Sequence, residues 1–369
     1  MSILRATHKI VKTQVTPHIP QVWARLIPFG IAALSLRPLT SCNANARTTG
    51  VSRGAAEVKM ARLLGNAKLP GTMANIVTHL GLVSERSYVN VDHSDFNGLV
   101  ALVFAVQTRI GRALPIFQET AYSGKLSARK DAPKRTQTLR AHYEARNKKS
   151  DETKRTIASL KKLRKVLGFW PKLVFDRGFG GRDIIRLLVR EDATFYIRLK
   201  SSRLVEIAGE NDQATGNGMP FPVKNSKRFD EMVTISGQQL RVIRSPKNGK
   251  DDEPWYILTS DLERSRNKIV RIYYHRFEIE ETFRDIKTVL GMRRTKLRKP
   301  NSLCVLLWFV ILGILLLYLA GLGIMGLRAL RARLTRPHPK KRLSWYRVLM
   351  ELREMEIAKL SYGIVTGLG

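Results

Sequence analysis

The chain has 369 residues, enough for two or three domains with a sizeable core, and 44% of its residues are hydrophobic. Lysine and arginine number 65 against 30 aspartates and glutamates, which gives a formal net charge of +35. This composition excludes a collagen, a disulfide-rich miniprotein and a wholly disordered chain, and the positive excess makes a nucleic acid the expected partner.

The N-terminal part of the chain, residues 1–84, predicts a small basic helical region. It holds ten lysines and arginines and a single acid, and helical spacing of apolar residues appears at 51–66 and again from Thr72. We interpret it as a DNA-binding region. Two alternatives are an outer layer of the main domain and, for the acid-free first 56 residues, a targeting peptide.

Residues 85–200 predict a sheet that begins as a meander. Strands are expected at 88–92, 99–108 and 113–121, with Gly111 in the tight turn between the last two. A basic stretch at 125–165, either a duplex-tracking segment or a solvated loop, ends in a helix. A strand at 172–176, a helix after Gly178–Gly181 and a strand at 195–199 complete the order βββαβαβ.

The remaining chain predicts a return to the same sheet after an insertion. Short alternating runs between glycines and prolines indicate a β-rich insertion at 201–254, followed by a strand at 255–259 and one long helix at about 266–290. Residues 303–327 lack any charge, which favours a buried core helix although the run meets the length criterion of a membrane span. We divide the chain into regions 1–84, 85–200, 201–254, 255–330 and 331–369, the last a basic linker with a helix that could contact a second protomer.

Two aspartates are candidate metal ligands because each follows an apolar run. Asp92 follows Tyr-Val-Asn-Val and Asp176 follows Leu-Val-Phe. A carboxylate at a strand end is held rigidly where the strand leaves the core, as a divalent-metal ligand must be. Each could instead be a cap or turn residue, and Asp95 competes with Asp92.

The predicted helix at 266–290 places an aromatic residue, two cations and a carboxylate on one face. Tyr273, Arg276, Glu280 and Lys287 are separated by three, four and seven residues. By spacing alone, Glu280 could simply pair with Arg276 or Arg284 on a solvated surface.

These residues resemble a known signature. The pattern Y-x2-R-x3-E-x6-K, which starts at Tyr273, is similar to the YREK motif of the insertion-sequence-four family of DDE transposases. Further similarity lies around Asp92 and Arg112-Ala-Leu-Pro115, in Phe-Asp176-Arg-Gly-Phe-Gly, in Phe-Tyr-Ile-Arg198 and in Trp-Tyr-Ile-Leu-Thr259. The matches keep their order over residues 55–325, whereas the first 50 residues match no part of the family pattern.

The resemblance implies an α/β (α+β) fold with an RNase H-like mixed sheet flanked by helices. It implies a catalytic triad of Asp92, Asp176 and Glu280 that holds two Mg²⁺ ions, with Mn²⁺ as a substitute, and an enzyme that cleaves the ends of an insertion sequence and joins the freed 3′-OH to target DNA. Neither a covalent enzyme intermediate nor a nucleotide cofactor is required.

The resemblance also implies the partners. Tyr273, Arg276 and Lys287 would hold phosphates at the element end, and Arg177 and Arg198 are further candidate DNA contacts. The partners would be double-stranded DNA, both terminal inverted repeats and target, and a second protomer in a homodimeric synaptic complex. No membrane partner is expected, and the location would be the cytoplasm of a bacterium or archaeon, at the nucleoid. The presence of only two cysteines, Cys42 and Cys304, agrees with a reducing compartment.

Three other hypotheses remain open at this stage. The first is a metal-dependent DNA nuclease on the same core, which cuts without joining. The second is a folded but catalytically inactive DNA-binding relic of a transposase. The third, suggested only by the apolar run at 303–327, is a basic membrane protein.

Overall fold

The computed structural model describes the central part of the chain. The described residues are 52–65, 69–108, 111–123, 152–207, 221–222, 230–235, 238–245, 254–288, 292–295 and 297–323. The predictions for the first 51 residues, for the basic stretch up to residue 151 and for the region 331–369 therefore lie outside the described residues.

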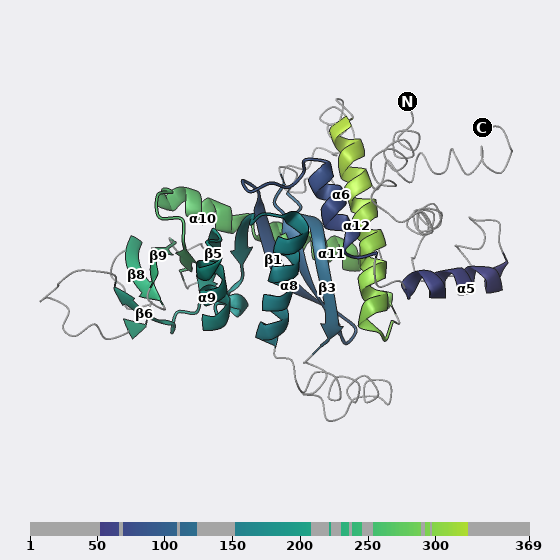
Figure 1. Cartoon of the computed structure of the whole chain (residues 1–369), viewed down its shortest axis with the longest axis horizontal. Helices are drawn as coiled ribbons and strands as arrows, with labels where there is room; N and C mark the ends of the chain where they lie inside the picture. The colour runs from purple at the N-terminus through teal and green to yellow at the C-terminus, as the bar shows by residue number, and fades with distance from the viewer. Residues whose placement is uncertain are drawn as a thin grey trace, which may run out of the picture.

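A single ten-stranded mixed sheet forms the centre of the molecule, in the order β3-β2-β1-β4-β5-β10-β9-β8-β6-β7 (Figure 1). The strands are β1 Tyr88–Phe96, β2 Leu99–Val106, β3 Leu114–Tyr122, β4 Lys172–Phe175, β5 Phe195–Leu199, β6 Leu204–Ile207, β7 Phe221–Pro222, β8 Asp230–Ile235, β9 Gln238–Arg244 and β10 Tyr256–Thr259. β1 to β3 pair antiparallel as a meander, whereas β1, β4 and β5 run parallel. This arrangement confirms the predicted α/β class with a mixed sheet of the RNase H-like kind.

The structure describes seven α-helices, most of which cover the two faces of the sheet. They are α5 Arg53–Leu64, α6 Thr72–His79, α8 Glu152–Leu167, α9 Arg182–Arg190, α10 Arg266–Tyr274, α11 Phe277–Thr288 and α12 Pro300–Gly323, with short 3₁₀ turns η4 Arg177–Phe179 and η6 Met292–Arg294. In Figure 1, α8 crosses in front of β1 and β3 while α11 lies behind them. Because neighbouring parallel strands require a crossover, α9 connects β4 to β5, and α8 precedes β4 where the chain returns from the meander.

The meander and the insertion both extend this sheet. Gly111, in the connection between β2 and β3, has φ +74°, a left-handed conformation that favours glycine. At the other end, β10 pairs antiparallel with both β5 and β9, so the β-rich insertion continues the central sheet outward. Figure 1 shows β6, β8 and β9 at the end of the molecule farthest from α12.

The structure corrects two predicted boundaries. β1 runs on to Phe96, so Asp92 lies inside a strand and not at its end, because the polar residues that follow Asp92 still pair with β2. The expected single helix at 266–290 is two helices, α10 and α11, with His275 and Arg276 between them.

The apolar run forms a buried helix, as predicted. α12 packs against β2 and β3, and each residue from Leu303 to Leu312 is at most 7% exposed. Trp308 is among the largest fully buried side chains of the described residues. Within the part of the chain that the structure describes, no helix qualifies as a membrane-spanning segment.

Candidate active site

The register of the parallel strands brings the two aspartates together. Val91 of β1 pairs with Phe175 of β4, the last pair of that ladder, so Asp92 and Asp176 are the next residues on two neighbouring strands. β1 continues beyond this point, whereas β4 ends and the chain turns into η4. Asp176 is thus at a strand end, as predicted, and Asp92 lies beside it on the neighbouring strand.

Arg276 joins the first aspartate to the glutamate. Its Nη1 lies 3.3 Å from Oδ2 of Asp92, and its Nη2 lies 2.5 Å from Oε1 of Glu280. The Arg276 side chain is 5% exposed, that of Asp92 18% and that of Glu280 47%. One buried guanidinium therefore holds the two carboxylates of β1 and α11 close to each other.

The electrostatics show that all three carboxylates share one environment. Burial raises the pKa of Asp92 to about 6; Arg276 and the backbone N–H of His93, 2.7 Å from Oδ1, oppose this increase, and Asp176 and Glu280 add to it by repulsion. Burial alone would lower the pKa of Arg276, but nearby Tyr273 and the three carboxylates raise it overall. Perturbed titration in a cluster of this kind is typical of functional sites.

The donor set suits a hard divalent cation, since it consists of carboxylate oxygens. As the side chains stand, however, the described residues contain no group of three or more histidine, cysteine, aspartate or glutamate side chains arranged to hold a metal ion. The structural reason is visible in the ion pairs, because the guanidinium of Arg276 bridges Asp92 and Glu280. Loading a metal would require these two carboxylates to exchange Arg276 for the ion.

Tyr273 lies in the interior directly beside Arg276. It is 0% exposed, its ring centroid is 5.8 Å from the guanidinium carbon, and Trp255 contacts it edge-on at 5.3 Å. Burial raises its pKa. Neither the Tyr273 hydroxyl nor the Arg276 Nε has a hydrogen-bond partner among the described residues. Unpartnered buried donors are costly, and the adjacent Arg276 guanidinium partly opposes the effect of burial on the Tyr273 pKa.

The other predicted DNA contacts occupy different parts of the described structure. Arg198 of β5 lies over the Trp255 ring at 5.9 Å and contributes to the electrostatics of Tyr273, which places it beside these two packed aromatic residues. Arg177, the residue after Asp176, is exposed. Lys287 is farther along α11, and its Nζ lies 5.3 Å from the ring centroid of Phe96 at the end of β1.

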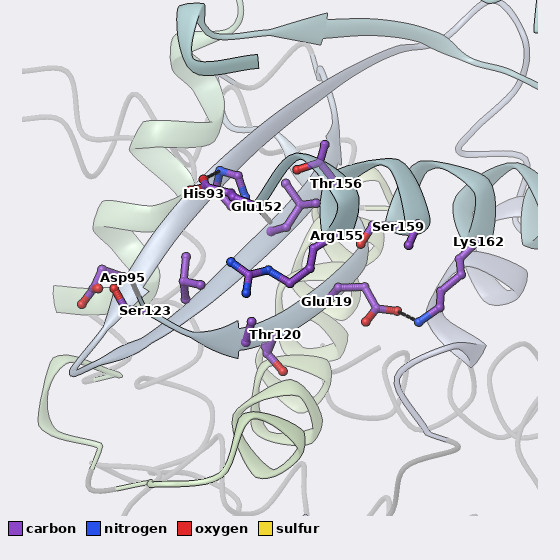
Figure 2. Close-up of a pocket in the computed structure, with 14 residues that line it drawn as sticks. His93, Asp95, Glu119, Thr120, Ser123, Glu152, Arg155, Thr156, Ser159 and Lys162 are labelled. Atoms are coloured by element: carbon purple, nitrogen blue, oxygen red, sulfur yellow. Dashed lines mark hydrogen bonds and ion pairs between the residues drawn. The ribbon is translucent and has the colours of Figure 1, made fainter. Parts of the chain in front are cut away.

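Asp95, the alternative to Asp92, lies elsewhere. It lines a hollow of about 500 Å³ between α8 and the strands β1 to β3, together with His93, Glu119 and Arg155 (Figure 2). Successive side chains of a strand point to opposite faces, so this hollow is on the face of the sheet opposite Asp92. Its polar side chains are partly paired with one another, as in His93 with Glu152 and Lys162 with Glu119.

Sequence reasoning missed the polar residues that tie α11 to the sheet. Arg112 Nε contacts Asp285 Oδ2 at 2.6 Å, and the backbone N–H of Thr108 donates to Glu278 Oε2 at 3.0 Å. Asn90, which is 0% exposed, donates to the carbonyl oxygens of His275 and Arg276 at 3.1 and 3.4 Å. One signal existed, since Asn90 is a polar residue in an apolar strand on the same face as Asp92.

Comparison with known proteins identifies the class of domain. Residues 135–317, just under half of the chain, match the family model described as a transposase DDE domain. The match includes Asp176, Arg276 and Glu280, whereas Asp92 lies upstream of it. A search among curated proteins found no match. The match supports a DDE transposase, an enzyme of polynucleotidyl transfer that acts on DNA and belongs to a family that generally uses a divalent metal.

Proposed function

We propose that this protein is a transposase of the insertion-sequence-four, or YREK, family. It would cleave DNA at the terminal inverted repeats of an insertion sequence and transfer the freed 3′-OH into target DNA. The observation that carries this proposal is the convergence of Asp92, Asp176 and Glu280 around Arg276, inside a chain that matches a transposase DDE domain. In a protein of net charge +35, an acidic cluster is otherwise unfavourable for binding a polyanion.

The three carboxylates would hold the metal, which we take to be two Mg²⁺ ions with Mn²⁺ as a substitute. When bound, such ions supply Lewis-acid activation of the attacking oxygen and stabilise the leaving oxygen. Asp92 lies within β1 and Asp176 directly follows β4, whereas Glu280 is half-exposed on α11 and pairs with Arg276.

The basic and aromatic residues would position the DNA. Arg276 and Tyr273 carry buried donors without partners, and the non-bridging oxygens of a phosphate are the acceptors that such donors fit. We assign them to the phosphates nearest the cleaved bond, with Arg198 and Arg177 as further contacts. Lys287, beside Phe96, would meet the backbone at a more distant phosphate.

The chemistry consists of two phosphoryl transfers. In the first, a water oxygen attacks phosphorus and the bond to the 3′ oxygen breaks, which leaves a 3′-OH on the element and a 5′-phosphate on the flank. In the second, that 3′-OH attacks a phosphorus of the target strand, whose own 3′ oxygen leaves. Both steps conserve electrons, so neither an oxidant nor a nucleotide is needed. Acting on two element ends, the enzyme would work as a homodimer at the nucleoid.

Cleavage and strand-transfer assays with Mg²⁺ on terminal-repeat DNA test the proposal. We expect Asp176→Asn and Glu280→Gln to reduce both steps at least about 100-fold and to leave DNA binding in place, because an amide is a poor metal ligand. Asp183→Asn, an exposed aspartate in the first turn of α9, is the matched control and should remain active.

The result also separates the related hypotheses. Cleavage without joining would indicate a nuclease on this core, and inactivity of the wild-type protein with intact DNA binding would indicate a relic. Full activity of Asp176→Asn would contradict the proposed triad.

A further inference from the structure

We propose that Asn90 and Gln107 are positioning residues that hold the junction between α10 and α11, and thereby place Arg276 and Glu280 against Asp92. This inference rests on the proposed function of the triad. Neither residue belongs to the YREK pattern, and neither touches a carboxylate of the triad in the contacts that the structure records. Their role follows from the need of backbone carbonyls at the break between α10 and α11 for hydrogen-bond donors.

The break leaves the backbone carbonyl of Ile272 without its helical partner. In a continuous helix, the N–H of residue 276 would donate to the carbonyl of Ile272, but here it donates to Tyr273 at 2.9 Å. The turn continues in the same tight manner, with Glu278 N–H to the His275 oxygen and Ile279 N–H to the Arg276 oxygen. The Ile272 carbonyl thereby loses its helical donor, and buried carbonyls need one.

Two side-chain amides from the meander donate hydrogen bonds to backbone carbonyls of this junction. Gln107 Nε2 donates to the Ile272 oxygen at 3.1 Å and to Asn90 Oδ1 at 2.8 Å. Asn90 Nδ2 donates to the carbonyl oxygens of His275 and Arg276. The primary amides thus use all four of their donor hydrogens within one network, and they clamp three carbonyls of the junction from β1 and from the end of β2.

The clamp is placed where it can control the active site. Asn90 and Asp92 are two residues apart in β1 and lie on the same face of the sheet, and Asn90 grips the backbone of Arg276, whose side chain reaches Asp92 and Glu280. The position of the α10–α11 junction therefore fixes the distance between the acid of β1 and the acid of α11. Displacements of about 1 Å in such an arrangement cost on the order of 100-fold in rate.

A matched control exists in the same sheet. Gln118 of β3 is 1% exposed, and its Nε2 donates to the backbone oxygen of Cys304 in α12 at 3.3 Å. Like Asn90, Gln118 is a buried amide that donates a hydrogen bond to a backbone carbonyl, but α12 carries no predicted site residue. Gln118→Leu should therefore reproduce the stability loss of Asn90→Leu without its effect on the site.

The experiment compares Asn90→Leu, Gln107→Leu and Gln118→Leu in the full chain. We expect the first two to lower kcat for DNA cleavage more than tenfold with KM for DNA changed less than threefold, and to weaken Mn²⁺ binding measured by electron paramagnetic resonance at least fivefold. Gln118→Leu should leave kcat, KM and Mn²⁺ binding within twofold of wild type. Equal effects of Asn90→Leu and Gln118→Leu would overturn the inference.

A double-mutant cycle tests the inference without metal or DNA. If Asn90 positions Arg276, the drop in melting temperature caused by Arg276→Gln should shrink by at least half in the Asn90→Leu background and stay unchanged in the Gln118→Leu background. Strict additivity in both backgrounds would overturn the inference. Gln107→Leu replaces Asn90→Leu in the cycle if the latter does not fold. Failure of the proposed function would be detected separately, because Asp176→Asn would then retain cleavage activity.

Discussion

At the scale of single residues, Arg276 is central to the candidate site, because its side chain contacts residues of both β1 and α11. It is almost fully buried, it pairs with Asp92 and Glu280, and it stacks on Phe277, whose ring centroid is 4.7 Å from the guanidinium carbon. An arginine in this place balances carboxylates that would otherwise repel one another. A bound metal would take over that balance and leave the guanidinium available for phosphate.

Replacing Arg276 with an uncharged residue should make the free energy of unfolding depend on Mg²⁺. Arg276→Gln leaves Asp92 and Glu280 unpaired, and we expect it to lower the free energy of unfolding by about 1–3 kcal/mol, a value reduced for the exposure of Glu280. Mg²⁺ at millimolar concentration should restore more stability to this variant than to the wild type. Thermal unfolding with Mg²⁺ and with a chelator measures both quantities.

The control for this prediction is Arg284→Gln. Arg284 pairs with Glu281 at the surface of the same helix, with the arginine side chain 65% exposed, so its loss should change the unfolding free energy by less than about 0.5 kcal/mol. A Mg²⁺ response of the same size in both variants would show that Arg276 does not compensate the carboxylates.

At the scale of elements, the sequence predicts strands better than it predicts where helices break. β5 begins and ends at the predicted residues, and the strands of the meander lie within a few residues of their predicted bounds. The break at His275 could not be predicted because apolar residues recur at helical spacing through it, in Ile272, Ile279 and Phe283. The break is stabilised by two side-chain amides that lie 165 and 185 positions upstream of the carbonyls they contact, and no local pattern can reveal such contacts.

The site shows the same division between local and distant information. Asp176 and Glu280 could be selected from motif spacing, but the alignment of Asp92 with Asp176 depends on the parallel register of β1 and β4. The polar residues His93 and Asp95 predict the end of the strand, whereas β1 continues through them to Phe96. Those residues face the hollow under α8, where a polar side chain is tolerated within a strand.

The packing of α12 yields a prediction at the element scale. Leu307, 1% exposed, is buried where α12 packs on the sheet, and we expect Leu307→Ala to lower the free energy of unfolding by about 2–5 kcal/mol through lost burial and a residual cavity. Val58→Ala on α5, where the side chain is 51% exposed, should cost less than about 0.5 kcal/mol. Urea denaturation of both variants is the measurement, and similar losses would contradict the core role of α12.

At the scale of the whole molecule, charge dominates the expected behaviour. The net charge of +35 greatly exceeds what the triad or the YREK residues contribute, so most of the attraction to DNA is independent of the site. The uncompensated lysines and arginines would displace condensed counterions from a duplex, and this release makes affinity fall steeply with salt.

Salt titrations should therefore separate binding from chemistry. For six to ten phosphate contacts, affinity is expected to fall about 10³- to 10⁵-fold between 50 and 200 mM salt. Asp176→Asn should show the same slope of log affinity against log salt, because it removes no cation. Fluorescence anisotropy with labelled duplex DNA gives both slopes, and a flat dependence in the wild type would exclude backbone-driven binding.

The clamp between the meander and the α10–α11 junction also determines when the enzyme can become active. Its two halves, at Asn90 and at His275, are separated by 185 positions, and Glu280 follows later still. The ribosome synthesises the chain from its N-terminus, so β1 is made many seconds before the α10–α11 junction that it contacts. A polypeptide that ends before Glu280 lacks one carboxylate of the proposed triad and one half of the clamp, so we expect truncated chains to be inactive in the cleavage assay.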